Sequence, residues 1–194
     1  MDLSNPSTKA WSEYVSAISS GAGHRAWWFA RDPDPLTKNP GGFEGLEKSL
    51  EYIGELIHKT GPVHGIWGFS QGACFAGMLL ALLGEKNRGH PMRRFLPKDQ
   101  GQPAMGIFFS GFKPRFEQYD AIYSSGIEAP TMHVMGLNDS TVSVERSEFF
   151  IGSCRSATVL KHSGGHDIPK SEEDRERILH FLKESLRKTD RQLL

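Results

Sequence analysis

The sequence lacks the marks of several protein classes. Only two of its 194 residues are cysteines, Cys74 and Cys154, which are too few for a disulfide framework and have no metal-ligand spacing, so we predict two free thiols. The chain carries no net charge at pH 7 and so offers no broad field for nucleic acid or an anionic membrane. Its longest apolar run, around Phe75 to Leu83, is far shorter than a membrane span, and its start lacks the pattern of a signal peptide. We therefore predict a soluble, cytoplasmic protein with neither a nucleic acid nor a membrane as partner.

The length and composition fit a single globular domain. A chain of 194 residues buries about 70% of its unfolded surface on folding, which is enough for one sizeable core. Residues 1–24 differ from the rest, because they are polar, with one short amphipathic stretch and a loose Ser-Ser-Gly joint. We therefore predict an atypical N-terminal segment, 1–24, followed by one α/β domain, 25–194.

Short apolar runs alternate with helical patterns along this domain. Apolar or β-branched runs predict strands at 63–67, 104–109, 131–135 and 157–160. Apolar residues at helical spacing predict helices at 43–57, 71–83, 142–151 and 171–187. The proline-containing stretches 31–42 and 84–103 are predicted as loops. Strands that alternate with helices indicate a mostly parallel sheet covered by helices on both faces.

The sharpest motif is Gly68-Phe69-Ser70-Gln71-Gly72, a G-x-S-x-G set between a predicted strand and a predicted helix. In this context the serine sits at the tip of a tight turn, with its Oγ exposed at the carboxyl end of the sheet, and the flanking glycines let strand and helix approach. The start of the helix places the Gln71 N–H and a positive dipole end where an oxyanion would form. We predict that Ser70 is a nucleophile and Gln71 an oxyanion donor. A glycine-flanked serine that only caps the helix is the alternative.

A serine nucleophile needs a histidine to take its proton and a carboxylate to orient that histidine, in the chain order Ser, Asp or Glu, His. Asp139 follows the strand predicted at 131–135, and His166 follows the strand predicted at 157–160. Both therefore lie at the same end of the sheet as Ser70. Asn138-Asp139 is also typical of a turn and helix cap. We predict a Ser70, His166 and Asp139 triad.

His162 is the serious rival to His166 among the eight histidines. Two histidines four residues apart are also found in metal sites, but Gly164-Gly165 breaks the helix that would bring both rings to one face, and no third ligand is evident. We therefore predict no metal and no cofactor.

Several ordered motifs from Arg25 onwards resemble those of the FSH-type fungal serine hydrolases, small α/β-hydrolases similar to the ovarian-cancer-associated serine hydrolase. The matching stretches are residues 25–29, 45–57, 61–73, 109–112, 136–139 and 164–169. The resemblance implies an α/β-hydrolase fold and hydrolysis of a small acyl ester or thioester. Because fungal relatives release polyketide chains from a synthase, it also implies a role in secondary metabolism, with a synthase carrier domain as partner. Proximity to the motifs predicts an acyl pocket lined by Trp27, Trp28, Phe112 and Ile168.

The resemblance fails before Arg25. Family members usually begin with an apolar strand that ends in Leu-His-Gly, lies beside the nucleophile strand and leads into a loop with a second oxyanion donor, and residues 1–24 do not match it. We therefore expect a sheet that is incomplete on its N-terminal side, with strand 63–67 as a bare apolar edge through which copies of the chain associate. A truncated gene product, a mispredicted start and a degenerate relative are the open explanations.

The predicted function is that of a serine esterase or thioesterase that forms an acyl-enzyme on Ser70. One alternative is a catalytically impaired accessory or binding protein that keeps the fold but lacks a complete oxyanion site. The other is an acyltransferase, which passes the acyl group to an alcohol or amine instead of water.

Overall fold

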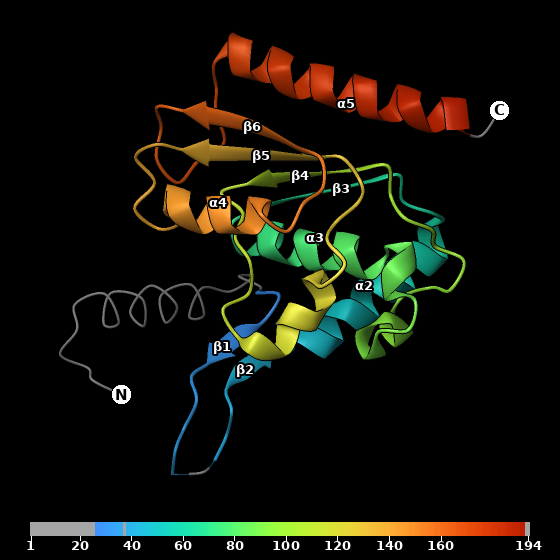
Figure 1. Ribbon diagram of the computed structural model, residues 1–194, viewed down its shortest axis with the longest axis vertical. Coiled ribbons are helices and arrows are strands. Elements are labelled where there is room, and N and C mark those ends of the chain that lie inside the picture. The colour runs from blue at the N-terminus through green and yellow to red at the C-terminus, as the bar shows by residue number, and fades with distance from the viewer. Residues whose placement is uncertain (1–25, 37, 193–194) are drawn as a thin grey trace.

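The centre of the molecule is a four-stranded parallel sheet with the strand order β3-β4-β5-β6 (Figure 1). The computed structural model describes residues 26–36 and 38–192, so the predicted segment 1–24 lies outside the described residues. The strands are β3 Gly65–Phe69, β4 Met105–Phe109, β5 Thr131–Gly136 and β6 Ala157–His162. The predicted α/β alternation is confirmed. The first of these strands extends to Phe69 instead of ending at Trp67, so it runs directly into Ser70.

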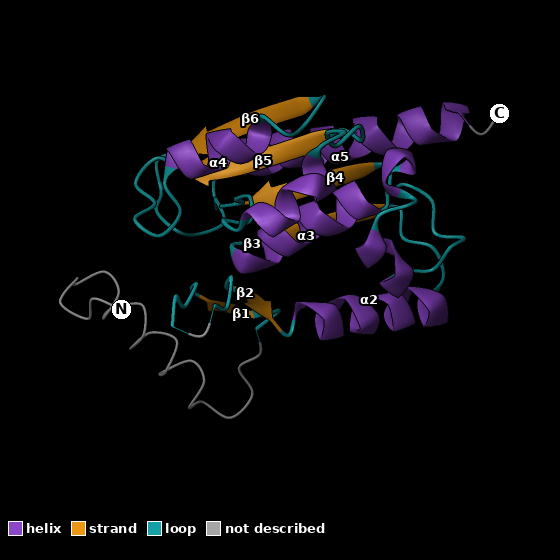
Figure 2. Cartoon of the chain, turned by 60° about the horizontal axis from the view of Figure 1, so that its bottom comes forward, coloured by secondary structure: helices purple, strands orange, loops and turns teal. Residues whose placement is uncertain are grey.

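Helices cover both faces of the sheet, as predicted (Figure 2). On one face lies α3, Gln71–Leu82, together with α4, Val144–Ile151. Every residue of α3 from Ala73 to Leu82 is buried, because the helix is enclosed between the sheet and α2, Leu46–Thr60. A helix without a polar face is typical of such a sandwiched position.

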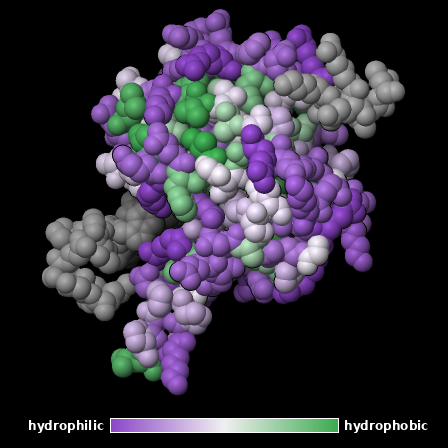
Figure 3. Space-filling model, viewed as in Figure 1, coloured by the Kyte–Doolittle hydropathy of each residue, from purple (hydrophilic) through white to green (hydrophobic). Residues whose placement is uncertain are grey.

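The other face is covered in part by α5, Glu172–Gln192. Its residues Ile178, Phe181 and Leu182 pack against a buried cluster on β4, β5 and β6. An open groove of about 530 Å³ separates one flank of the helix from the starts of β5 and β6. Figure 3 shows apolar side chains at the surface between the polar outer side of α5 and the rest of the molecule. Among the described residues, no helix is long and apolar enough to cross a membrane.

The stretch 31–42, predicted as a loop, is the turn of a β-hairpin. β1, Phe29–Arg31, pairs antiparallel with β2, Gly42–Glu44. The loop prediction is wrong at Arg31 and Gly42, and the helix predicted at 43–57 begins only at Leu46, because Phe43 and Glu44 belong to β2. Long-range packing is the reason. The Phe43 ring stacks on Trp28 at 4.5 Å and on Tyr119 at 4.8 Å between centroids, and these contacts hold the flanking backbone extended.

The stretch 84–103 is a loop, as predicted, with two short 3-10 turns at Glu85–Asn87 and Pro91–Phe95. The buried Gln100 side chain anchors its end, since its Oε1 accepts the Val63 N–H and its Nε2 donates to the Val63 carbonyl. This clamp fixes the segment that enters β3.

β3 forms an edge of the sheet. Within the described ranges it pairs with β4 and with no other strand. Trp67 is 65% exposed and Phe69 is 37% exposed. The predicted bare apolar edge is therefore confirmed for the described part of the chain.

Candidate active site

Ser70 lies in the tight turn between β3 and α3. Its backbone has φ 53° and ψ −121°, which is a strained combination for a residue other than glycine. A Cβ atom on Gly68 would lie 2.3 Å from the Gly72 carbonyl oxygen, so strand and helix approach too closely for a side chain at Gly68. A Cβ atom on Gly72 would meet only Trp27 Nε1, at 3.5 Å. The predicted steric need for glycine is therefore correct at Gly68 and wrong at Gly72.

The structure brings the predicted serine, histidine and aspartate together at the carboxyl edge of the sheet. Ser70 Oγ lies 2.9 Å from His166 Nε2, and His166 Nδ1 lies 2.8 Å from Asp139 Oδ2. The three residues follow β3, β6 and β5, which end at one edge because they are parallel. The His166 side chain is 23% exposed and that of Asp139 only 1%. Such a chain of groups can move the hydroxyl proton onto the imidazole.

The Asp139 carboxylate is held by donors on both oxygens. Its Oδ1 accepts the N–H groups of Thr141 and Val142, each at 2.8 Å, while its Oδ2 faces His166. Burial raises the pKa of this carboxyl, but these donors and the Ser110 hydroxyl together outweigh burial, so the pKa lies below its ordinary value. The carboxylate is therefore charged at neutral pH and can hold the imidazole tautomer that keeps the proton on Nδ1.

The His166 loop reaches the serine by crossing close over the end of β5. A Cβ atom on Gly136 would lie 2.1 Å from the Gly165 carbonyl oxygen, so the crossing requires glycine at position 136. The Phe69 ring packs against the imidazole, with ring centroids 4.7 Å apart. Phe69 was not singled out by the sequence, although its place directly before the serine is a usable signal.

The rival histidine lies elsewhere. His162 is 8% exposed at the end of β6, and its Nδ1 accepts the Gly164 N–H at 3.1 Å. It takes no part in the hydrogen-bond chain that starts at Ser70. Across the described part of the chain, no three His, Cys, Asp or Glu side chains gather closely enough to hold a metal ion.

Gln71 contributes a backbone group and a side chain. As the first residue of α3 it has an N–H without an intrahelical acceptor, at the positive end of the helix. Its side-chain Oε1 accepts the Trp27 N–H, and its Nε2 donates to the Trp28 carbonyl, both at 3.0 Å. This clamp ties the aromatic segment to the turn that carries Ser70. No local sequence pattern signals it, because the partners are 44 and 43 residues apart.

The predicted pocket residue Trp28 is a core residue. It is 4% exposed, and its ring packs against Phe43 and Phe75. This burial gives no support to the role of Trp28 in an acyl pocket, which stays a prediction. Trp27 is half-buried, with its ring 4.6 Å from that of Phe75 and its Nε1 beside Gly72. Trp27 is thus near the serine turn, and its contact with substrate stays a prediction.

The other two predicted pocket residues are Phe112 and Ile168. Phe112 is half-buried beneath the guanidinium of Arg146, which lies 4.4 Å from the ring centroid. Arg146 also donates to the Thr141 carbonyl at 3.2 Å and so connects the Asp139 turn to the segment after β4. Ile168 is 48% exposed, two residues beyond the histidine. Their roles as pocket residues stay predictions.

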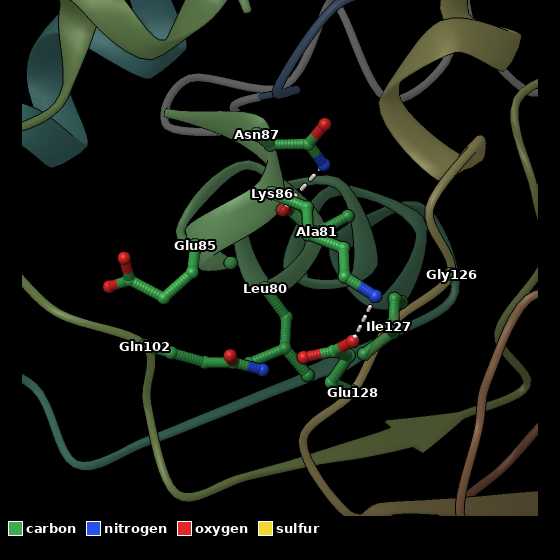
Figure 4. Close-up of a pocket in the computed structure, with 10 residues that line it drawn as sticks. Leu80, Ala81, Glu85, Lys86, Asn87, Gln102, Gly126, Ile127 and Glu128 are labelled. Atoms are coloured by element: carbon green, nitrogen blue, oxygen red, sulfur yellow. Dashed lines mark hydrogen bonds and ion pairs between the residues drawn. The ribbon is translucent and has the colours of Figure 1, made fainter. Parts of the chain in front are cut away.

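A small cavity, shown in Figure 4, lies away from this edge. It has a volume of about 10 Å³ and is lined by the end of α3 and by residues 84–87, 102 and 126–128. Lys86 and Glu128 form an ion pair of 2.6 Å beside it. Because Ser70 lies at the opposite end of α3, and because the space suits at most about one water molecule, this cavity is not an acyl pocket.

The parallel sheet, the strained turn after β3 and the grouping of serine, histidine and aspartate at one edge define an α/β-hydrolase fold. The chain belongs to the serine hydrolase (FSH1) family, whose model matches residues 2–178. The match begins earlier than the resemblance inferred from the motifs, which starts at Arg25, and it includes most of the segment 1–24.

Relatives in animals agree with this family assignment, and a solved plant structure agrees with the fold. The chain is 30% identical over 164 residues to an esterase of Drosophila melanogaster, CG5412, with 84% of this chain and 55% of the relative covered. It is 32% identical over 162 residues to the human esterase OVCA2, with 81% and 67% covered. The chain thus spans little more than half the length of the fly relative. The crystal structure of Zea mays acyl-protein thioesterase 2 superposes with a TM-score of 0.60 at 16% identity, covering 92% of this chain and 88% of that one, which supports the fold.

Proposed function

We propose that the chain is a serine esterase or thioesterase in which Ser70, His166 and Asp139 carry the reaction. The single observation behind this proposal is the hydrogen-bond chain from Ser70 Oγ through the imidazole to the buried carboxylate. Membership of a serine hydrolase family and relatives named as esterases support the same reaction class.

In the first step Ser70 Oγ attacks the acyl carbonyl carbon while His166 Nε2 takes the hydroxyl proton. Asp139 stabilises the positive charge that develops on the ring by accepting from Nδ1. The Gln71 N–H donates to the carbonyl oxygen as it becomes an oxyanion. The imidazolium then gives its proton to the departing alcohol or thiol, which leaves an acyl group on the serine.

In the second step a water molecule takes the place of the leaving group. His166 removes a proton from the water, the hydroxide attacks the acyl-serine, and the serine recovers its proton as the acid leaves. If an alcohol or amine occupies the position of the water, the same residues perform acyl transfer. Product analysis in the presence of a competing acceptor separates hydrolysis from transfer.

The finer part of the proposal concerns the substrate. We propose a thioester on a polyketide synthase carrier domain, released as a free acid in fungal secondary metabolism. The resemblance to FSH-type hydrolases supports this class, and two unbridged cysteines, Cys74 and Cys154, support a reaction in the reducing cytoplasm. A preference for carrier-bound thioesters over p-nitrophenyl esters of equal acyl length is the expected result. Equal rates on both would contradict the carrier-domain role.

A specific observation favours the second candidate, an accessory protein with impaired catalysis. β3 is an edge strand among the described residues, and Gln71 provides the one oxyanion donor assigned in this part of the chain. Loss of one of two oxyanion donors typically lowers kcat by about 10²–10³. Turnover of short p-nitrophenyl esters and thioesters therefore separates an enzyme from an accessory protein.

Labelling with a fluorophosphonate tests the nucleophile directly. We expect one covalent adduct on folded protein, located at Ser70 by peptide mapping and absent from Ser70→Ala. Ser147→Ala is the matched control, because its buried hydroxyl donates to the Gly111 carbonyl and lies outside the hydrogen-bond chain. Label on another serine while Ser70 stays unmodified would overturn the assignment.

A further inference from the structure

Within the part of the chain that the structure describes, the exposed edge of β3 lacks the usual protection of an edge strand. Its sequence Gly-Ile-Trp-Gly-Phe contains no charged residue and no proline, the two common devices that prevent pairing between molecules. We propose that this edge pairs with the same edge of a second copy of the chain, antiparallel, so that two four-stranded sheets join into one. This proposal does not depend on the catalytic roles proposed above.

The backbone groups of the edge are self-complementary. The Ser70 N–H donates to the Phe109 carbonyl of β4. In a parallel strand, the backbone groups of alternate residues face opposite neighbours. Gly65, Trp67 and Phe69 therefore direct their N–H and C=O groups away from β4. With Trp67 on a two-fold axis, Gly65 of each copy lies opposite Phe69 of the other. All three outward residues then form hydrogen-bonded pairs, and both copies use the same surface.

The side chains on this edge match the same arrangement. Trp67 and Phe69 are in register with Ile107 and Phe109, so they lie on the face that carries α5. A two-fold axis perpendicular to the sheet keeps the aromatic rings of both copies on this face. Each Phe69 ring then lies beside the bare backbone of a glycine, where it has room.

Two leucines of α5 extend the apolar surface. The polar flank of the helix borders the groove toward β5 and β6, and its Ile178 and Phe181 face the sheet. By the helical repeat, Leu179 and Leu186 fall on the opposite flank, nearer β3. They are 50% and 37% exposed. Two such helices on one face of a joined sheet would flank the paired aromatic rings.

Area and charge set the expected strength of the pairing. A buried aromatic side chain removes about 150–250 Å² of surface from water. Trp67 is 65% exposed and Phe69 37%, so together they offer roughly 200 Å² of surface per copy. The strand backbone and the two leucines add further contact area. A standard interface buries about 800 Å² per partner, so this dimer falls at the weak end. With no net charge on the chain, repulsion between copies is small. The dimer is therefore expected to depend on concentration.

Sedimentation velocity across the micromolar range, combined with amide hydrogen exchange, tests the proposal. We expect a reversible monomer–dimer equilibrium in which the amides of Gly65, Trp67 and Phe69 gain protection with concentration. Those of Ile66 and Gly68, which already face β4, should not change. If the amides of Ile66 and Gly68 gained protection instead, the proposed edge would be wrong. A monomer at every concentration would overturn the dimer.

Variants locate the interface. Trp67→Lys should abolish the dimer, whereas the matched control Phe149→Lys, at an aromatic residue 67% exposed on α4, should leave it intact. Leu179→Glu should weaken the dimer. Because this residue lies on the helix surface, the variant tests the interface without a change in β3, whose own variant could misfold. A dimer that survives Trp67→Lys and Leu179→Glu, or that is lost equally in the α4 control, contradicts this interface.

A second observation concerns Ser110, directly after β4. Its φ of 46° lies in the left-handed region, and the residue is 1% exposed. Its hydroxyl has no partner at full hydrogen-bond geometry, yet it lies close enough to the Asp139 carboxylate to help lower the pKa of that group. A buried serine that is both strained and unsatisfied calls for a functional explanation.

We infer that Ser110 is a positioning residue, whose hydroxyl holds the Asp139 carboxylate as charge develops on His166. Three donors already occupy this carboxylate, two backbone N–H groups on Oδ1 and the imidazole on Oδ2. The Ser110 hydroxyl is a further donor beside this carboxylate, and the Arg146 guanidinium also interacts with its charge. This inference rests on the proposed function.

Ser110→Ala and Ser110→Gly test it together. Both remove the hydroxyl, but glycine also relieves the strained φ, so a loss shared by both belongs to the hydroxyl. We expect kcat to fall about tenfold, and the acid limb of the rate profile to move to higher pH, because the Asp139–His166 pair binds its proton more tightly without this donor. Ser147→Ala should leave the limb in place. If both Ser110 variants had unchanged kinetics while Ser70→Ala was inactive, the role of Ser110 would be wrong and the proposed function would stand.

Discussion

His133 makes the stability of the fold depend on pH in a window set by its burial. The side chain is 1% exposed in the middle of β5, with its ring 5.3 Å from that of Phe108 and 5.0 Å from that of Phe150. Its Nε2 lies 3.1 Å from Thr131 Oγ1, and its Nδ1 has no partner. Burial lowers the pKa of this imidazole from 6.5 to about 4, because no neighbouring group compensates the charged form.

The direction of the change in stability with pH depends on whether the folded or the unfolded chain binds the proton more tightly. Above pH 6.5 the imidazole is neutral in both states, and its full contribution to stability is present. Between pH 6.5 and about 4 the unfolded chain takes up a proton that the folded chain refuses, so stability falls as the pH falls. At about 1.4 kcal/mol per pH unit the total loss is roughly 3 kcal/mol. The lowered pKa of Asp139 acts at lower pH, below its ordinary value of 3.8.

Urea unfolding at a series of pH values, for the wild type and His133→Leu, isolates this group. The variant keeps an apolar side chain between the two phenylalanine rings, and Thr131 Oγ1 keeps its bond to the Ser156 carbonyl. The difference in unfolding free energy between the two proteins should be constant above pH 6.5 and should shift in favour of the variant by roughly 3 kcal/mol down to about pH 4. Parallel curves across this window would refute the reasoning.

Two further predictions concern the site. Asp139→Asn and His166→Ala should each lower kcat on the order of 10³-fold or more, while His162→Ala should lower it far less, and steady-state kinetics with an equal loss at His162 would mean that the loop roles are assigned wrongly. Gly68→Ala should destabilise the fold by about 2 kcal/mol or more, because its Cβ would lie 2.3 Å from a backbone oxygen, whereas Gly72→Ala should be tolerated. Equal urea midpoints for these glycine variants would contradict the steric argument.

The grouping of the triad residues was accessible from the sequence because it depends on topology. Once the strands at 131–135 and 157–160 are parallel to the strand before Ser70, whatever follows each strand meets at one edge, so Asp139 and His166 needed no knowledge of packing. The preference for His166 over His162 was accessible only in part. The glycines before His166 allow the loop that carries it to the serine, but the strand predicted at 157–160 ends before His162, and only the structure extends β6 to include that residue.

What the sequence could not provide depends on contacts between distant segments. Trp27 and Trp28 are neighbours in the chain, yet their side chains have different surroundings. Only the positions of Phe43 and Phe75 decide that Trp28 is the buried one. The hairpin around 31–42 was missed for the same reason. Ser110 carries no periodic signal, and its strained φ arises from how β4 ends between two neighbouring strand ends.

The strain at the site is sustained by the core directly beneath it. Ser70 and Ser110 follow residues paired in register, Phe69 and Phe109, and each is held at a positive φ that costs on the order of 1–3 kcal/mol. The turn at Ser70 leads into a helix buried from Ala73 to Leu82, whose removal from water stabilises the fold far more than these costs. A helix with one polar face could shift outward to relax the turn, but α3 is packed on all sides and cannot. The same burial that makes α3 apolar therefore keeps the Ser70 hydroxyl at 2.9 Å from His166 Nε2.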